Sequence, residues 1–78
     1  MKEAIDRIRR MEEIFDTLRA DPSRTDLRQT LTAYYEGGQW LRDYELDEAG
    51  LLPPDLKRGV LSQDGMYHIL DEIGEVHP

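Results

Sequence analysis

Residues 55–64 read Asp55-Leu56-Lys57-Arg58-Gly59-Val60-Leu61-Ser62-Gln63-Asp64 and follow directly on a double proline, Pro53-Pro54. Almost every residue in this run has a local structural preference, which indicates a defined backbone path. We expect a turn of tight helix from Asp55 to Gly59 that leads into a loop, with Gly59 adopting the positive φ that glycine tolerates. We also expect Arg58 to pair with Asp43 or Asp47 and so to hold this run against the preceding helix.

The pattern after this run predicts a last helix. Ser62 is a natural N-cap, and Asp64 in the first turn suits the positive end of the helix dipole. Gly74 is expected to end the helix. Its buried face is predicted to consist of the apolar residues at helical spacing, Met66, Ile69, Leu70 and Ile73.

The N-terminal segment, residues 2–20, has a helical pattern with a wide apolar stripe. The stripe consists of Ala4, Ile8, Met11, Phe15 and Leu18, widened on its two sides by Ile5 and Ile14. A stripe of this width can contact two neighbouring elements. The charged side chains on the rest of this helix, among them Arg7 and Glu12, interleave in sign and are expected to be solvated.

Two more helices are predicted before the double proline. Asp21-Pro22 is expected to cap and begin a second helix that runs to about Glu36 and ends at Gly37-Gly38. Gln39–Glu48 is predicted to be a third, short helix, with Trp40, Leu41 and Tyr44 on one face.

These segments together predict the fold class. No segment alternates between apolar and polar residues for long enough to predict a strand. We therefore expect an all-α single domain, residues 1–78, built as a small bundle of three or four helices. A long ordered connection, Gly50–Leu61, precedes the last helix of this bundle.

The charge of the chain is unevenly distributed. Residues 1–31 carry seven basic and seven acidic side chains, whereas residues 32–78 carry three basic and ten acidic ones, which accounts for the net charge of −7. An acidic half of this kind repels phosphate backbones, so nucleic acid is not an expected partner.

Cysteine content and hydrophobicity bear on the compartment. The chain has no cysteine, which fits a reducing compartment. Its first residues include acids and no apolar run, unlike a secretory signal, and no segment approaches the roughly 20 apolar residues of a membrane span. We therefore expect a cytoplasmic protein that does not enter a membrane.

A set of short motifs extends along most of the chain. The motifs are Arg7-Ile8, Met11-Glu12, Phe15-Asp16, Tyr34-Tyr35, Trp40-Leu41, Asp43, Asp47, Leu52-Pro53, Asp55 to Ser62, and Asp64. In these motifs the chain resembles a family of short bacterial proteins catalogued as domain of unknown function 4298. The run from Leu56 to Ser62 is the most specific part. The chain departs from the family at Gly37-Gly38 and at Gly65, where helix formers are expected. The resemblance implies an all-helical fold and transfers no catalytic residue.

The acidic stretch after Trp40 does not fit a calcium loop. An EF-hand loop that starts at Asp43 requires glycine at its sixth position and glutamate at its twelfth, but these positions hold Glu48 and Pro54. A start at Glu45 places Gly50 sixth and Leu56 twelfth, so it fails as well.

The last helix offers a second possible metal site. Asp64, His68 and Glu72 lie at i, i+4 and i+8, and their side chains are types that bind divalent metals. They lie opposite the apolar stripe, however, and we expect them to form a solvated face. No metal site and no cofactor are therefore predicted.

No group of side chains predicts catalysis. Ser23 and Ser62 are explained as turn or cap residues. Gly37-Gly38 lacks the preceding strand and the following Lys-Ser/Thr of a phosphate-binding loop. We therefore expect no catalytic residue and no enzyme that acts alone.

The candidate binding residues lie around the aromatic side chains of Tyr34, Tyr35, Trp40 and Tyr44. We favour these rings as the core of a small protein, because aromatic side chains bury a large area each. The alternative is a surface that binds a partner, and one tyrosine can be buried while another is exposed. The candidate binding residues are Trp40, Asp43, Tyr44, Asp47, Lys57, Arg58 and Asp64.

Two function classes remain open from the sequence. The first is a small cytoplasmic protein–protein interaction or regulatory module, which binds an unidentified protein or self-associates through leftover apolar surface on the first helix. The alternative is a small-ligand or metal-binding accessory domain of an enzyme system, with a pocket between Trp40, Tyr44 and residues 57–64. We favour the first class, because no acid, base and nucleophile converge in the sequence.

Overall fold

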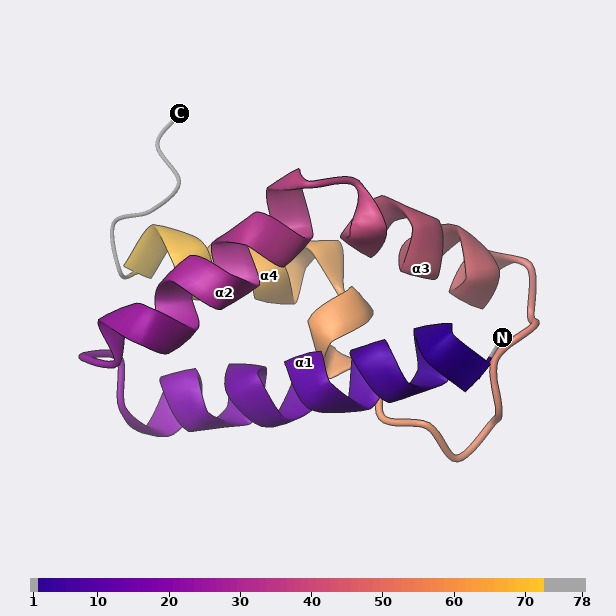
Figure 1. The fold of residues 1–78 in the computed structure, drawn as a ribbon, viewed down its shortest axis with the longest axis horizontal. Coiled ribbons are helices and arrows are strands. Elements are labelled where there is room, and N and C mark those ends of the chain that lie inside the picture. The colour runs from indigo at the N-terminus through magenta and orange to yellow at the C-terminus, as the bar shows by residue number, and fades with distance from the viewer. Residues whose placement is uncertain (1, 73–78) are drawn as a thin grey trace.

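The computed structural model describes residues 2–72, with side chains described up to residue 70, and this part of the chain folds into four α-helices without a strand. The helices are α1 (Lys2–Ala20), α2 (Thr25–Glu36), α3 (Gln39–Glu48) and α4 (Gln63–Glu72), and a turn of 3-10 helix, η1 (Gly59–Leu61), precedes α4. Figure 1 shows α1 and α2 as an antiparallel pair, with α3 continuing from α2 back toward the N-terminal end of α1. The predicted all-α bundle with an ordered connection before its last helix is confirmed.

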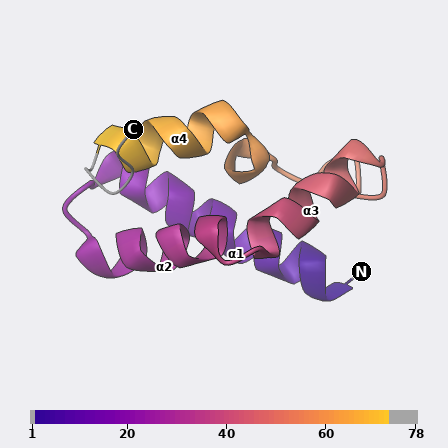
Figure 2. The same ribbon diagram turned by 90° about the horizontal axis from the view of Figure 1, so that it is seen from above.

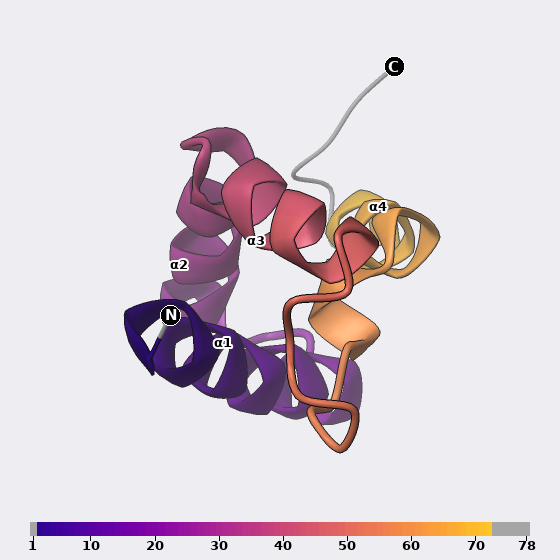
Figure 3. The same cartoon turned by 90° about the vertical axis from the view of Figure 1, so that its right-hand side faces the viewer.

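The helices surround one apolar core. Seen along the long axis of the molecule, α1, α2, α3 and α4 lie around its centre (Figure 3). In the view from above, α4 lies along the upper edge of the picture, and α1 and α2 lie below it (Figure 2). Every one of these elements contributes buried apolar side chains, which include Ile8, Phe15, Leu18, Leu31, Trp40, Val60, Met66 and Leu70. No helix in the described part of the chain is long and apolar enough to cross a membrane.

The wide stripe on α1 is used on two sides, as its width predicts. The helix packs against α2 on one side and against η1 on the other. All its large apolar side chains are buried except Ile5, which is half-buried against the core. The described part of α1 therefore lacks the leftover apolar surface on which self-association was predicted. The exposed large apolar side chains lie elsewhere: Leu41, Leu51 and Tyr67, with exposed fractions of 53%, 57% and 44%.

The connection between α3 and α4 passes alongside α1 before it enters η1 (Figure 3). η1 contacts α1, α3 and α4, so it lies at the centre of the packing. The tight helical turn is Gly59–Leu61 instead of the predicted Asp55–Gly59, and a separate turn is closed by a 3.2 Å hydrogen bond from the Leu56 nitrogen to the Pro53 oxygen. The prediction of a positive φ at Gly59 is wrong, because among the glycines that the structure describes it is Gly38 and Gly50 that have a positive φ.

Gly50 ends α3 through a Schellman motif. With φ of 72°, Gly50 donates its N–H to the Asp47 oxygen at 3.0 Å, and Leu51 donates its N–H to the Leu46 oxygen at 3.1 Å. Leu46 packs against the core, whereas Leu51 is exposed. Leu41 is also exposed, so it does not share the buried face predicted for it with Trp40.

The starts of α4 and α2 differ in how they are capped. Ser62 accepts a 3.1 Å hydrogen bond from the Gly65 nitrogen, which confirms it as the cap of α4. Asp21 does not cap α2, which begins at Thr25; its carboxylate instead accepts hydrogen bonds from the nitrogen and hydroxyl of Ser23 and so shapes the turn after α1. The residues predicted to continue and end the last helix, Ile73 and Gly74, lie outside the described part of the chain.

Candidate functional site

Asp43 is the centre of a polar network that connects three helices. Its side chain, on α3, is completely buried. Arg7 of α1 donates from Nε to Asp43 Oδ2 at 2.9 Å and from Nη2 to Oδ1, which is the bidentate geometry of a strong arginine–carboxylate pair. The Tyr34 hydroxyl of α2 donates to Oδ2 at 2.8 Å. The expectation that Arg7 lies on a solvated face is wrong, because this pair holds its guanidinium against the core.

The network changes the ionisation of Tyr34 and Arg7. Burial raises the pKa of Tyr34 far above its ordinary value, and the hydrogen bond to Asp43 raises it further, because a negative charge beside the hydroxyl opposes ionisation. The hydrogen bond to Asp43 also raises the pKa of Arg7, which therefore stays protonated. Tyr34 therefore stays neutral and Arg7 stays protonated over the whole physiological pH range.

Alkaline titration is expected to separate Tyr34 from the other tyrosines. The folded-state pKa of Tyr34 lies above the unfolded value of about 10, so its contribution to stability is fully present below that pH and is lost as the pH rises toward the folded pKa. Tyrosinate absorbance should therefore show one of the four tyrosines ionising only as the protein unfolds. Tyr34→Phe should remove this late component and Tyr67→Phe should not. A late component that survives in Tyr34→Phe would contradict the assignment.

Glu12 forms a second buried polar contact, between α1 and η1. It is buried, and its carboxylate accepts from the Gly59 nitrogen at 3.0 Å and from the Val60 nitrogen at 2.8 Å. A Cβ at Gly59 would lie 2.7 Å from Glu12 Oε1, so an alanine there would displace the Glu12 carboxylate, and the preference for glycine comes from this close approach and not from a positive φ. Glu12 was predicted to be solvated. Its position four residues after Ile8 and three before Phe15 could have placed it at the edge of the apolar stripe.

Arg58 holds the connection in place, as predicted. Its Nε donates to Asp47 Oδ1 at 2.7 Å, which selects Asp47 from the two predicted partners. Its guanidinium also donates to three carbonyl oxygens of the connection itself, the shortest contact being 2.7 Å from Nη2 to the Pro53 oxygen. Lys57 points away from this cluster and forms an exposed ion pair with Asp16 of α1, 2.8 Å long.

The aromatic side chains belong mainly to the core. Trp40 is buried, and its indole N–H donates to the Val60 oxygen at 2.8 Å, so it fixes η1 against α3. Its ring stacks on Tyr44 with 5.1 Å between centroids and meets Tyr35 edge-on at 4.9 Å. Tyr44 and Tyr35 are half-buried. The predicted mixed arrangement is therefore present, with Trp40 and Tyr34 inside and two tyrosines partly at the surface.

The seven candidate binding residues are not brought to a common cavity. Trp40 and Asp43 are buried, Tyr44, Asp47 and Arg58 are half-buried, and Lys57 and Asp64 are exposed. Of these, Lys57 lines a cavity of about 260 Å³ beside α1. Among the described residues, no three metal-binding side chains are grouped closely enough to hold a metal ion, and the side chain of Glu72 lies outside them.

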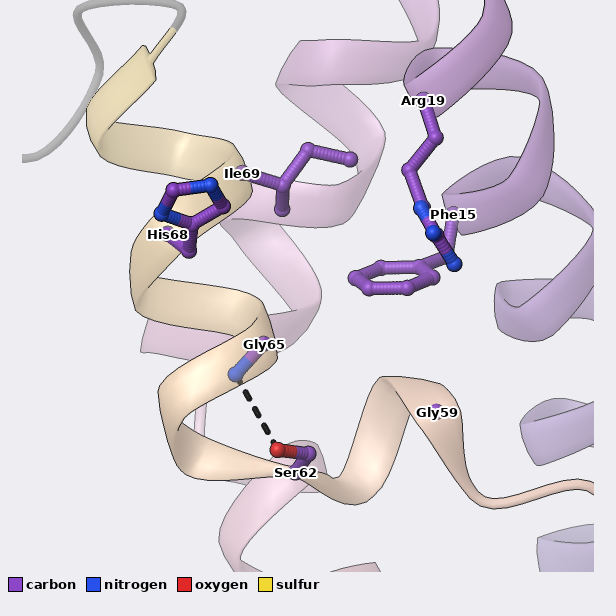
Figure 4. A pocket seen from close by; sticks show the side chains of 7 residues that line it. All are labelled: Phe15, Arg19, Gly59, Ser62, Gly65, His68 and Ile69. Carbon is purple, nitrogen blue, oxygen red and sulfur yellow. Dashed lines mark hydrogen bonds between the residues drawn. The ribbon is translucent and has the colours of Figure 1, made fainter.

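A cavity of about 460 Å³ lies on the opposite side of η1, between α1 and α4 (Figure 4). Its lining residues are Phe15, Arg19, Gly59, Ser62, Gly65, His68 and Ile69. None of them is among the seven candidates. The sequence signal for this cavity was weak. Its lining residues come from three separate segments, and these segments face one another only in the folded chain.

Comparison with known proteins identifies one match. The model of the family described as a domain of unknown function (DUF4298) matches residues 1–77. No curated protein and no solved structure matches the chain.

Proposed function

This chain belongs to the DUF4298 family, and from that premise we propose that it is a small, non-catalytic interaction module that binds a basic partner protein through the outer surface of α3. The observation that supports the proposal is the exposure of Leu41 and Leu51, each more than half exposed in a chain whose other large apolar side chains are mostly buried. An exposed leucine is unremarkable alone, but Leu41 lies in the first turn of α3 and Leu51 follows its C-terminal end, so an exposed apolar side chain at each end of this helix can anchor a partner.

The charge around these leucines indicates the chemistry of the partner. Glu45 and Glu48 follow Leu41 at i+4 and i+7, so they lie on the same stripe of α3, and both are exposed. Arg42 is exposed next to Leu41 and is the one basic side chain of α3. A partner segment with apolar anchors flanked by lysine or arginine is complementary to this surface, and its association would weaken with salt.

Several residues predicted to bind a partner have structural roles instead, so the exposed surface of α3 is the better candidate for binding. Asp43 and Arg58 form hydrogen bonds within the fold, and Trp40 is buried. The surface is small, so we expect a transient complex of the kind formed by interfaces below about 1,200 Å². Because a chain without cysteine suits a reducing compartment, we also propose a cytoplasmic location.

Affinity capture with paired variants tests this function. The wild type is expected to retain a basic protein from a lysate at low salt. The variant Leu41→Ser/Leu51→Ser should lose it, and Tyr67→Ser should keep it, because Tyr67 is a comparably exposed apolar residue on α4. Circular dichroism should show that all three proteins remain folded.

Two outcomes would overturn the proposal. In the first, no retained protein depends on Leu41 and Leu51. In the second, analytical ultracentrifugation finds a dimer of this chain that the leucine variant breaks, which would assign the surface to self-association. The alternative class, a small-ligand accessory domain, is favoured by a different observation, the cavity between α1 and α4.

A further inference from the structure

The cavity between α1 and α4 has the dimensions of a small-molecule site. Its volume of about 460 Å³ lies within the range of known ligand pockets, roughly 300 to 1,000 Å³. It is formed by the C-terminal half of α1, by η1 and by the first turns of α4 (Figure 4). It lies apart from the surface of Leu41 and Leu51, so its occupancy is independent of the function proposed above.

The cavity is lined by two large apolar side chains and by two glycines. Phe15 and Ile69 are buried side chains that face into it from α1 and α4 (Figure 4). Gly59 and Gly65 contribute no side chain, and a Cβ at Gly65 would lie 3.3 Å from Ser62 Cβ and Oγ. Gly65 lies in the first turn of α4, and an alanine there would crowd the Ser62 side chain at the edge of the cavity.

The polar groups at the rim can satisfy a negative charge. Arg19 is exposed and makes no ion pair with any described residue, and its guanidinium carbon lies 5.8 Å from the centre of the Phe15 ring. Figure 4 shows this guanidinium extending along the cavity beside that ring. Ser62 Oγ accepts from the Gly65 nitrogen, which leaves its hydroxyl hydrogen able to donate to a ligand. Among the lining residues that the structure describes, none is an aspartate or a glutamate.

We propose that this cavity binds a small organic anion, a carboxylate or phosphate monoester that carries an apolar group. Arg19 contacts the anionic group in a charge-assisted hydrogen bond, and the Ser62 hydroxyl donates to another polar atom of the ligand. The apolar group packs against Phe15 and Ile69. A cation is not expected there, because the lining side chains that the structure describes include Arg19 and no acidic group.

Titration of isotope-labelled protein with four probes tests the site: phenyl phosphate, benzoate, inorganic phosphate and the neutral benzamide. Phenyl phosphate or benzoate is expected to shift the amide signals of Gly59, Ser62 and Gly65, and the stronger of the two identifies the preferred anion. Benzamide should bind at least about tenfold more weakly, as expected on loss of one charge-assisted contact.

Charge variants on one helix complete the test. Arg19→Glu and Arg19→Gln should each weaken the anionic probe at least about tenfold. Arg10→Glu, an exposed arginine of the same helix, should not. Equal losses for Arg19 and Arg10 variants would show general electrostatic attraction and overturn the site. So would binding of inorganic phosphate as tight as that of phenyl phosphate, equal binding of benzamide, or no shift at millimolar probe.

Discussion

Replacing Arg7 with alanine is expected to lower the free energy of unfolding by about 3 to 5 kcal/mol, which is the effect of removing one partner of a buried ion pair. The variant leaves the Asp43 carboxylate completely buried with the Tyr34 hydroxyl as its remaining donor among the contacts described. A domain of this size has a total stability of about 4 to 12 kcal/mol. Urea unfolding of Arg7→Ala should therefore show a protein close to the limit of folding.

The two members of the pair are not expected to be equivalent. The Arg7 side chain is 23% exposed, whereas that of Asp43 is fully buried. In Asp43→Ala the guanidinium can turn toward water, so this variant should be less destabilised than Arg7→Ala. The double variant should cost less than the sum of the two, because neither charge is then left alone.

Arg10→Ala provides the matched control for this experiment. Arg10 is an exposed residue on the same helix, and its loss should change the free energy of unfolding by less than about 0.5 kcal/mol. If Arg7→Ala behaves like Arg10→Ala, Asp43 reaches water in solution and the three-helix network is not a structural centre.

The local parts of this fold could be predicted from the sequence. The end of α2 at Gly37, the end of α3 at Gly50 and the Ser62 cap depend on residues within a few positions of one another. The Arg58–Asp47 pair could also be anticipated, because its partners are 11 positions apart and frame one connection.

The long-range polar contacts could not be predicted in the same way. Arg7 and Asp43 are 36 positions apart, and Glu12 contacts backbone groups 47 and 48 positions away. On α1 these residues are surrounded by other charges, so composition alone does not single them out. Several arginines of α1 look equivalent in the sequence. Arg7 is the one that pairs with Asp43, because the packing of α1 beside α3 brings it to the buried carboxylate.

The candidate site shows the same division. The aromatic cluster was predictable as core, since aromatic side chains such as Trp40 and Tyr34 bury a large area each in so small a protein. The cavity was not, because its lining residues come from α1, η1 and α4 and face one another only after these elements pack. Gly65 alone, as a glycine in the first turn of a helix, does not predict a cavity unless the residues that face it are known.

Replacing Glu12 with alanine is expected to cost about 2 to 3 kcal/mol, because two backbone N–H groups lose a charged acceptor. The Val60 residue is completely buried, so its N–H has no access to water in the folded state. Glu13→Ala should be almost neutral, since Glu13 is exposed on the same helix. Urea unfolding measures both, and hydrogen exchange at the Val60 amide should accelerate in Glu12→Ala beyond the global change.

A second substitution separates the role of Glu12 from general packing. In the wild type, Gly59→Ala would place a Cβ 2.7 Å from Glu12 Oε1 and force this carboxylate away from the nitrogens that it binds. The same change in the Glu12→Ala background meets no carboxylate, so it should be much less costly there. Equal costs in the two backgrounds would contradict the claim that Glu12 fixes η1, because the alanine would then be rejected by the fold for another reason.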